Sequence, residues 1–163
     1  MEYAFLHKET LSHYLIAMPD LAPTVTFIMP IQGKPDFLVE QINAVFRFSN
    51  QYRGFCELII VFDETAKETE AIMKIAELAI KLNKVNHPHV RTRILHCTSP
   101  MSLNASVEMA LAHSLGDKIM IVTNDESNKF NPSQMIGIGV GQRDVMVTEC
   151  FLDETMFDEF MSK

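Results

Sequence analysis

The feature of this sequence that most constrains its fold is a series of short apolar runs that alternate with longer segments of helical periodicity. The runs are rich in aliphatic residues, many of them β-branched, which is typical of strands buried on both faces of a sheet. The segments between them repeat apolar residues at i, i+3 and i+4 and therefore predict amphipathic helices. Such alternation favours a parallel sheet. The four clearest runs span residues 24–29, 58–62, 90–97 and 118–122.

Local signals indicate where the three intervening helices begin. Pro35 suits a first helical position, where a missing N–H costs nothing. Thr65 and Glu68 have the spacing of a capping box, and Ser99-Pro100 opens a third helix that ends at Gly116. The second helix is predicted to bury a stripe that consists of Ile72, Ile75, Ala76, Ala79 and Ile80, widened by Leu78 and Leu82.

We therefore predict one α/β domain over residues 1–163, a three-layer Rossmann-like fold with a mostly parallel sheet. Residues 1–23 would form a short helix (8–17) and a linker, and residues 126–163 a further strand (144–150) and an acidic helix (152–161). The apolar segment 135–140 could cover a sheet edge or join a partner, which leaves a homo-oligomer open.

Charge and cysteine usage exclude several classes of function. The formal net charge is −7, which disfavours non-specific binding to nucleic acid or to anionic lipid. Cys56, Cys97 and Cys150 form no C-x-x-C pair and are interpreted as buried free thiols in a reducing compartment. The chain has no signal-peptide pattern and no apolar run near the ~20 residues that span a bilayer. We expect no transmembrane segment and a cytoplasmic location.

Polar residues that could carry chemistry follow the predicted strands directly. In an open parallel sheet, ligands bind beyond the carboxyl ends of the strands. The carboxylates of Asp63 and Asp125 lie at two such ends, where they could accept hydrogen bonds from a nucleotide or hold a divalent cation. The alternative is structural: Asp63 caps the following helix and Asp125 starts a turn.

The order of these segments resembles glycosyltransferase family 2. The likeness covers residues 24–125 and rests on TVTFIMP, LIIVFDETAKET and SLNASVEMALAHSLGDKIMIVTND. In that family a strand ending in proline is followed by a strand ending in Asp-Asp-Gly-Ser, a Gly-Asp pair and a strand ending in Asp-x-Asp. The resemblance implies the A-type, nucleotide-diphospho-sugar transferase fold, with strand order 3-2-1-4.

The resemblance also implies a set of site residues. Asp63 would contact the base of a nucleoside diphosphate sugar, and Asp125 would contact Mg²⁺ or Mn²⁺. The nucleotide-binding residues implied by position are Pro30, Gln32, Asp63, Thr65, Asn104 and Asn124.

The chain departs from the family pattern at two acidic positions and in its length. Phe62 replaces the first Asp of the second strand, and Thr123 replaces the first Asp of Asp-x-Asp. The matched region is only the first half of a typical member, and the late acids Glu149, Asp153 and Glu154 lack the context of a catalytic base. No catalytic residue is assigned. Three functions therefore stay open: a transferase, a non-catalytic sensor, scaffold or subunit, and an unrelated doubly wound domain.

Overall fold

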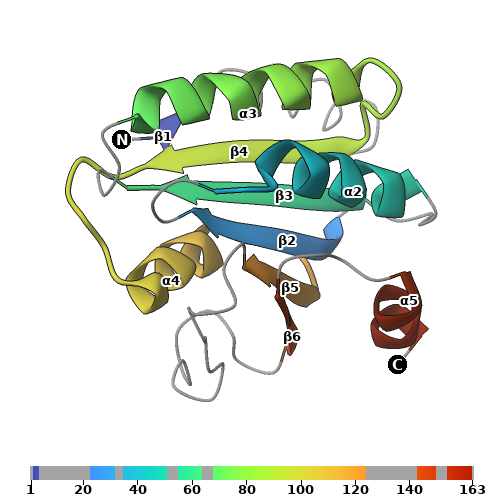
Figure 1. Ribbon diagram of the computed structural model, residues 1–163. Helices are drawn as coiled ribbons and strands as arrows, with labels where there is room; N and C mark the ends of the chain where they lie inside the picture. Colours follow the sequence, from blue (N-terminus) through green and yellow to red (C-terminus); the bar gives the residue numbers. More distant parts are fainter. Residues whose placement is uncertain are drawn as a thin grey trace.

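The computed structural model describes residues 2–3, 23–31, 35–50, 55–63, 68–123, 143–149 and 154–162. Within these residues the chain forms a six-stranded sheet flanked by helices (Figure 1). The strands are β1 (Glu2–Tyr3), β2 (Pro23–Ile31), β3 (Phe55–Phe62), β4 (Val90–His96), β5 (Lys118–Thr123) and β6 (Asp144–Glu149).

The sheet has the order β1-β4-β3-β2-β5-β6. The strands β2 to β6 are parallel to their neighbours, and only the two-residue β1 pairs antiparallel, with β4. The predicted α/β class and mostly parallel sheet are confirmed. Counted along the chain from β2, the order reads 3-2-1-4-5, so the chain reverses its direction across the sheet between β2 and β5.

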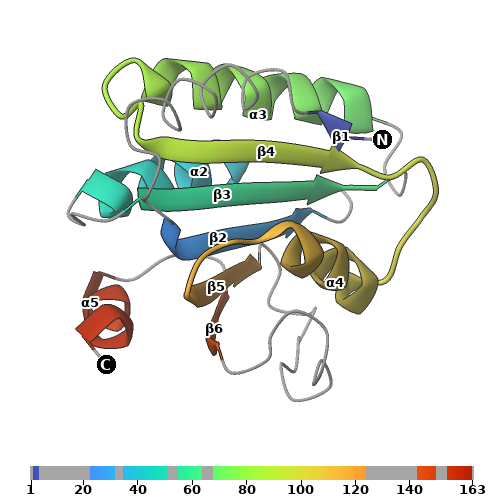
Figure 2. The same cartoon turned by 180° about the vertical axis from the view of Figure 1, so that it is seen from behind.

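Helices cover both faces of the sheet. The helices α2 (Leu38–Asn50) and α3 (Thr69–Lys84) lie on one face, and α4 (Leu103–His113) lies on the other, as the two opposite views show (Figures 1 and 2). The C-terminal helix α5 (Glu154–Ser162) packs on the α2 face, where the Phe157 ring lies 5.8 Å from that of Phe27.

Side chains alternate along each strand between two separate cores. On β3, Leu58 and Ile60 pack beneath α2 and α3, whereas Ile59 and Val61 pack beneath α4. A strand that is apolar on both sides must be covered on both sides. This is why the sequence shows continuous apolar runs instead of alternating ones.

All three predicted helix starts are wrong. The helix α4 begins at Leu103 after its N-cap Ser102, three residues beyond the predicted start at Ser99-Pro100. The helix α2 begins at Leu38, so Pro35 precedes it; Phe37 accepts the first helical bond from the Gln41 N–H at 2.9 Å. The helix α3 begins at Thr69 with Glu68 at its N-cap, so Glu68 does not occupy the third helical position that a capping box requires. The Thr69 hydroxyl instead donates to the Asp63 carbonyl at 3.0 Å and ties the helix start to the end of β3.

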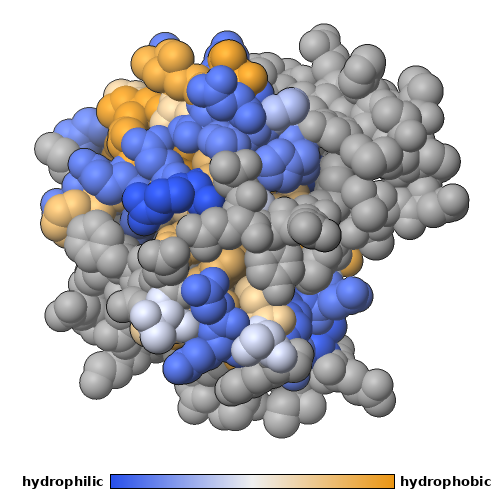
Figure 3. Space-filling view, turned by 90° about the vertical axis from the view of Figure 1, so that its right-hand side faces the viewer, coloured by the Kyte–Doolittle hydropathy of each residue, from blue (hydrophilic) through white to orange (hydrophobic). Residues whose placement is uncertain are grey.

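The predicted apolar stripe of α3 is only partly buried. Ile72, Ala76, Ala79 and Ile80 face the core, but Ile75 is 50% exposed. Leu78 and Leu82 are 58% and 65% exposed, so they do not widen the buried face. Figure 3 shows hydrophobic surface at the top of the molecule, where α3 lies in Figure 1.

Some expectations fall on other parts of the chain. The helix 8–17, the segment 135–140 and Cys150 lie outside the described residues. Cys56 and Cys97 are buried free thiols, as predicted. Among the described helices, none combines the length and the apolar character needed to cross a membrane.

Candidate functional site

The pairing of β2 with β5 ends before either strand does. The β2 strand pairs with β3 through Ile31, but its pairing with β5 ends at Ile28, opposite Ile121. The β5 strand continues to Thr123 beyond its last ladder pair with β2. The end of this pairing coincides with the reversal of strand order, which is where ligands bind in open α/β sheets. The strand order thus places a candidate site at the carboxyl edge of β2 and β5.

Pro30 lies in β2 beyond Ile28, the last residue that pairs with β5. It is buried inside the strand rather than after it, and it pairs with Val61 on the β3 side only. A proline has no N–H to give to a ladder, so it is tolerated where one side of a strand is unpaired. Pro30, which the sequence indicated as the end of a strand, therefore lies inside β2, where the pairing with β5 has ended.

Asp63 follows β3 at the same edge and is 3% exposed. Its Oδ2 accepts a hydrogen bond from the Met101 N–H at 3.1 Å, in the loop between β4 and α4. The N-cap residue of α3 is Glu68, whose side chain makes no cap bond, and the Asp63 carboxylate contacts the loop that leads to the helix of the opposite layer. Asp63 therefore fixes the loop that leads into α4.

The described candidates share one face of the sheet. Ile28, Ile59 and Val61 face α4, and the alternation of side chains puts Pro30 and Asp63 on that same face. Asn104 lies in the first turn of α4, just after the Ser102 N-cap, whose hydroxyl accepts from the Ala105 N–H at 3.1 Å. Pro30, Asp63 and Asn104 thus gather at one edge, beside the positive end of a helix dipole.

The end of β5 is held by groups that the sequence pattern did not single out. The Gln41 Nε2 of α2, in a side chain only 1% exposed, donates to the Thr123 carbonyl at 3.3 Å. This carbonyl lies beyond the last ladder pair with β2. Gln41 occupies a position in the apolar stripe of its helix. A single amide within such a stripe is the sequence signal that could have identified this residue.

Phe62 and Thr123, at the positions where the resemblance implied acids, have structural roles. Phe62 is 1% exposed and belongs to the core beneath α2 and α3. The Thr123 hydroxyl is turned to β6, where it donates to the Thr148 carbonyl at 3.2 Å. Neither side chain can therefore reach a ligand at the carboxyl edge without leaving its present partners.

Four predicted site residues, Gln32, Thr65, Asn124 and Asp125, lie outside the described residues. Within the part of the chain that the structure describes, no group of three His, Cys, Asp or Glu side chains is arranged to hold a metal ion. Cys97 follows β4 directly and lies at the same edge of the sheet. Burial raises the pKa of its thiol, and the negative charge of Asp63 raises that pKa further. This thiol is therefore protonated at neutral pH and is no nucleophile.

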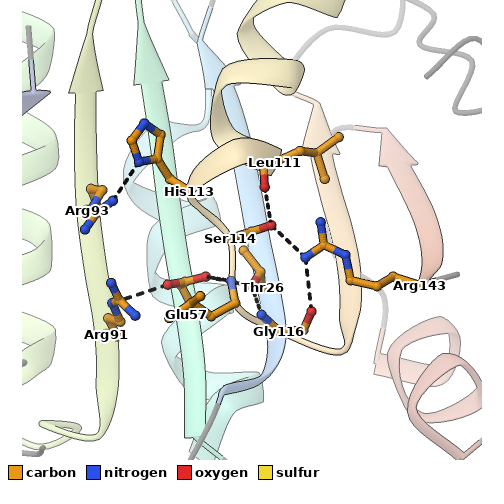
Figure 4. Close-up of polar contacts among 10 residues, drawn as sticks. Thr26, Glu57, Arg91, Arg93, Leu111, His113, Ser114, Gly116 and Arg143 are labelled. Atoms are coloured by element: carbon orange, nitrogen blue, oxygen red, sulfur yellow. Dashed lines mark hydrogen bonds and ion pairs between the residues drawn. The ribbon is translucent and has the colours of Figure 1, made fainter. Parts of the chain in front are cut away.

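A buried charge network lies at the opposite, amino edge of the strands (Figure 4). The Glu57 carboxylate, 2% exposed, pairs with the Arg91 Nε at 3.3 Å. Its Oε1 also accepts from the Thr26 hydroxyl at 2.8 Å and from the Leu115 N–H at 2.9 Å. Burial lowers the pKa of Arg91, and the Glu57 charge counteracts that shift. The sequence signal was an acid inside the apolar run of β3.

The same network explains Gly116, which the sequence placed in a family Gly-Asp pair. Its N–H donates to the Thr26 Oγ1 at 2.9 Å, and a Cβ added there would lie 2.6 Å from that oxygen and from the Thr26 N. Only glycine permits this approach. Arg143 Nη1 reaches over the same turn, to the Ser114 hydroxyl at 2.8 Å and the Gly116 carbonyl at 3.3 Å (Figure 4). These hydrogen bonds hold the turn between α4 and β5 in place.

A cavity of about 490 Å³ also lies at this amino edge, between β6 and α5. Its described lining comprises Asp144, Val145, Met146, Met156, Glu159 and Phe160. It is distant along the strands from the carboxyl edge, because Asp144 pairs with Lys118 at the first residue of β5. The cavity therefore does not belong to the candidate site.

Comparisons with known proteins give the following result. No family model matches the chain, and no curated protein matches it. Among solved structures, the fold is similar to a mannosyltransferase from Pyrobaculum calidifontis in complex with GDP-Man and Mn²⁺, at 19% sequence identity and a TM-score of 0.46. The match covers 75% of this chain and 36% of that chain, so this chain spans about a third of the length of the mannosyltransferase.

Proposed function

We propose that this chain binds a nucleoside diphosphate sugar at the carboxyl ends of β2 and β5. The observation that carries the proposal is the coincidence of three features at one edge. The strand order reverses there, the pairing of β2 with β5 ends at Ile28, and the buried carboxylate of Asp63 lies one strand away. The 3-2-1-4 order is also the one that the resemblance to family 2 glycosyltransferases implies.

Asp63 and the start of α4 serve different parts of the ligand in this proposal. The base lies next to Asp63, whose carboxylate accepts hydrogen bonds from donors on the ring, while the Met101 N–H holds that carboxylate in place. The phosphates lie nearer the first turn of α4, where backbone N–H groups and the helix dipole favour negative charge. Asp125, with Asn124 beside it, supplies the oxygen ligand for Mg²⁺ or Mn²⁺.

Isothermal titration calorimetry with UDP, GDP, ADP and CDP, each with and without Mn²⁺, tests the proposal. We expect at least one nucleotide to bind and Mn²⁺ to strengthen its binding. Asp63→Asn should weaken that binding ~10-fold or more, because a hydrogen bond to a charged group contributes about 1.5–3 kcal/mol. The amide oxygen can still accept from Met101, so the variant should keep the fold. Asp125→Ala should remove the effect of Mn²⁺.

The matched control is Asp158→Asn, which neutralises an exposed carboxylate on α5. It should leave nucleotide binding unchanged. Absence of heat with every nucleotide, in the presence of metal, would refute the proposed function. Equal losses in Asp63→Asn and Asp158→Asn would show that overall charge, and not the Asp63 site, governs binding.

The second candidate function is a sensor or scaffold that binds the nucleotide sugar without transferring the sugar. Phe62 in the core and the Thr123 hydroxyl on β6 favour it, because both family acids have been exchanged for residues with structural contacts. Release of free nucleoside diphosphate from the bound sugar nucleotide distinguishes the two. Binding without release, over hours and with Mn²⁺ present, supports the sensor; steady release supports a transferase or hydrolase.

A further inference from the structure

The strand β6 lies at one edge of the sheet, as Figures 1 and 2 show. Among the described strands it pairs with β5 alone, so its outer side pairs with no described strand. Three of its apolar residues, Val145, Met146 and Val147, are only partly buried. A strand with an unpaired side and half-buried apolar side chains is a template for the addition of another strand.

The cavity beside β6 reaches this outer side. It has a volume of about 490 Å³ and contacts Asp144, Val145 and Met146, which are consecutive residues. Successive side chains of a strand point to opposite faces, so a cavity over one face alone would contact alternate residues. The inner side of β6 is occupied by β5. The cavity therefore extends around the outer side of β6 at the start of the strand.

The lining of this cavity combines acidic and apolar groups. Asp144 of β6 and Glu159 of α5 supply carboxylates, and neither forms an ion pair with a described residue. Met146, Met156 and Phe160 supply apolar surface. The helix α5 contains acids but no basic residue, and the whole chain has a formal net charge of −7. A second acidic copy would be repelled here, whereas a basic partner would be attracted.

An ammonium group already lies against one of the lining residues. The Lys118 Nζ lies 5.2 Å from the centroid of the Phe160 ring and donates to the Phe160 carbonyl at 2.7 Å. The negative face of an aromatic ring and the last carbonyls of a helix both attract cations. A lysine side chain of a partner would meet these same groups, with the carboxylates of Asp144 and Glu159 in addition.

We propose that β6 adds an extended segment of a basic protein partner as a further strand, with lysine or arginine at the carboxylates of Asp144 and Glu159. Asp144 and Met146 are two residues apart and share the face of the sheet on which α5 packs. Residues of the added strand that face α5 are two positions apart for the same reason. The partner segment should therefore carry a basic and a bulky apolar residue two positions apart. The thioethers of Met146 and Met156 can adapt to apolar side chains of different shapes.

Fluorescence polarisation with a labelled peptide and the whole chain tests this. In the probe, lysine and leucine occupy alternate positions with threonine between them, so both can face α5. We expect it to bind, and its affinity to fall as the salt concentration rises. A peptide of the same composition with lysine and leucine adjacent should bind several-fold more weakly, because the two side chains then face opposite sides.

Two N-methylated peptides test whether the backbone pairs. Alternate N–H groups of a strand point to opposite sides, so one set would donate to β6 and the other would face away. One peptide carries N-methyl groups at the odd positions and the other at the even positions. We expect one of them to bind like the probe and the other to fail. Equal affinities of the two peptides would overturn the addition of a strand.

Substitutions at the cavity identify the place of binding. Asp144→Asn and Glu159→Lys should each weaken peptide binding several-fold. Asp158→Lys is the matched control, because Asp158 is exposed on the same helix but is not part of the described lining. All three positions are exposed, so the melting temperature of each variant should match that of the parent. Equal losses in Glu159→Lys and Asp158→Lys would overturn the proposal, because overall charge would then govern binding.

Two further outcomes would assign the cavity to another occupant. Displacement of the labelled peptide by an equal concentration of cadaverine would overturn the proposal in favour of a small organic cation. Self-association of the parent in sedimentation equilibrium that competes with the peptide would overturn it in favour of a second copy.

Discussion

Removal of the Glu57 carboxylate should destabilise this fold more than any other single loss of charge in the described network. Glu57 is 2% exposed and makes three contacts: an ion pair with Arg91 and two accepted hydrogen bonds, from the Thr26 hydroxyl and from the Leu115 N–H. Its partner Arg91 is 8% exposed, so water cannot replace the lost charge. Glu57→Ala therefore removes the carboxylate that pairs with a buried cation and the acceptor of the partly buried Leu115 N–H.

The magnitude follows from these contacts. Removal of one partner from a buried ion pair costs about 3–5 kcal/mol, and the loss of the hydrogen bond at the partly buried Leu115 N–H costs about 0.5–1.5 kcal/mol. We expect Glu57→Ala to lower the free energy of unfolding by ~4 kcal/mol or more, and the melting temperature by roughly 10 °C. Glu57→Gln keeps an oxygen for Thr26 and Leu115 but turns an N–H donor towards Arg91, so its cost should be about 2–3 kcal/mol.

A double-mutant cycle measured by urea unfolding checks the reasoning. If the cost of Glu57→Gln comes from the Arg91 charge, Glu57→Gln in an Arg91→Met background should cost far less than in the parent, with a coupling of about 1.5 kcal/mol or more. Lys74→Met, which removes an exposed cation on α3, serves as the control background and should show no coupling. Additive losses in the Arg91→Met background would refute the ion pair as a coupled element.

Three further predictions concern stability. Gly116→Ala should cost several kcal/mol, because its Cβ would lie 2.6 Å from Thr26 backbone and side-chain atoms; urea unfolding measures it. Phe62→Asp should prevent folding, because it buries a charge in the core, whereas Phe62→Leu should fold; circular dichroism distinguishes the two outcomes. Burial lowers the pKa of Lys84 from 10.5 to about 8. The folded protein therefore has its full stability above pH 10.5, where Lys84 is neutral in both states, and loses part of it as the pH falls through 8. The free energy of unfolding should therefore rise from pH 8 to 10, and Lys84→Met, unlike Lys81→Met at an exposed position, should flatten that rise by about 1 kcal/mol after allowance for partial exposure.

The sheet could be predicted from the sequence because its strands are buried on both faces. The continuous apolar runs located β2, β3, β4 and β5 to within one to three residues, and the parallel β6 followed its predicted range. The two-residue β1 has no pattern to detect. The start of α3 was misplaced because the Thr69 hydroxyl bonds to the Asp63 carbonyl, a contact that depends on how the strand end and the helix meet in space.

The candidate site could be predicted only in outline. The rule that ligands bind at the carboxyl ends of parallel strands selected Asp63, and the structure places Asp63 at that edge. Its actual partner, the Met101 N–H, comes from the loop between β4 and α4, and no local pattern predicts such a contact. The sequence does indicate the network at the amino edge, because Glu57 is an acid within a buried strand and a buried acid needs a partner. That partner, Arg91, could not be chosen over Arg93 before the strand register was known.

The carboxyl edge shows how structural contacts restrict a ligand site. The side chain at position 62 packs in the core and that at position 123 bonds to β6, so carboxylates at these positions would lose those contacts. On the proposed function, a divalent ion would then find no carboxylate at positions 62 and 123 and would depend on Asp125, phosphate oxygens and water for its shell, which Mg²⁺ accepts. Such an ion binds weakly to the protein alone and more tightly when the nucleotide is present. By thermodynamic linkage, the ion must strengthen nucleotide binding by the same factor. Strong mutual dependence of metal and nucleotide is therefore what this arrangement of residues requires, and a tight metal site in the absence of nucleotide would contradict it.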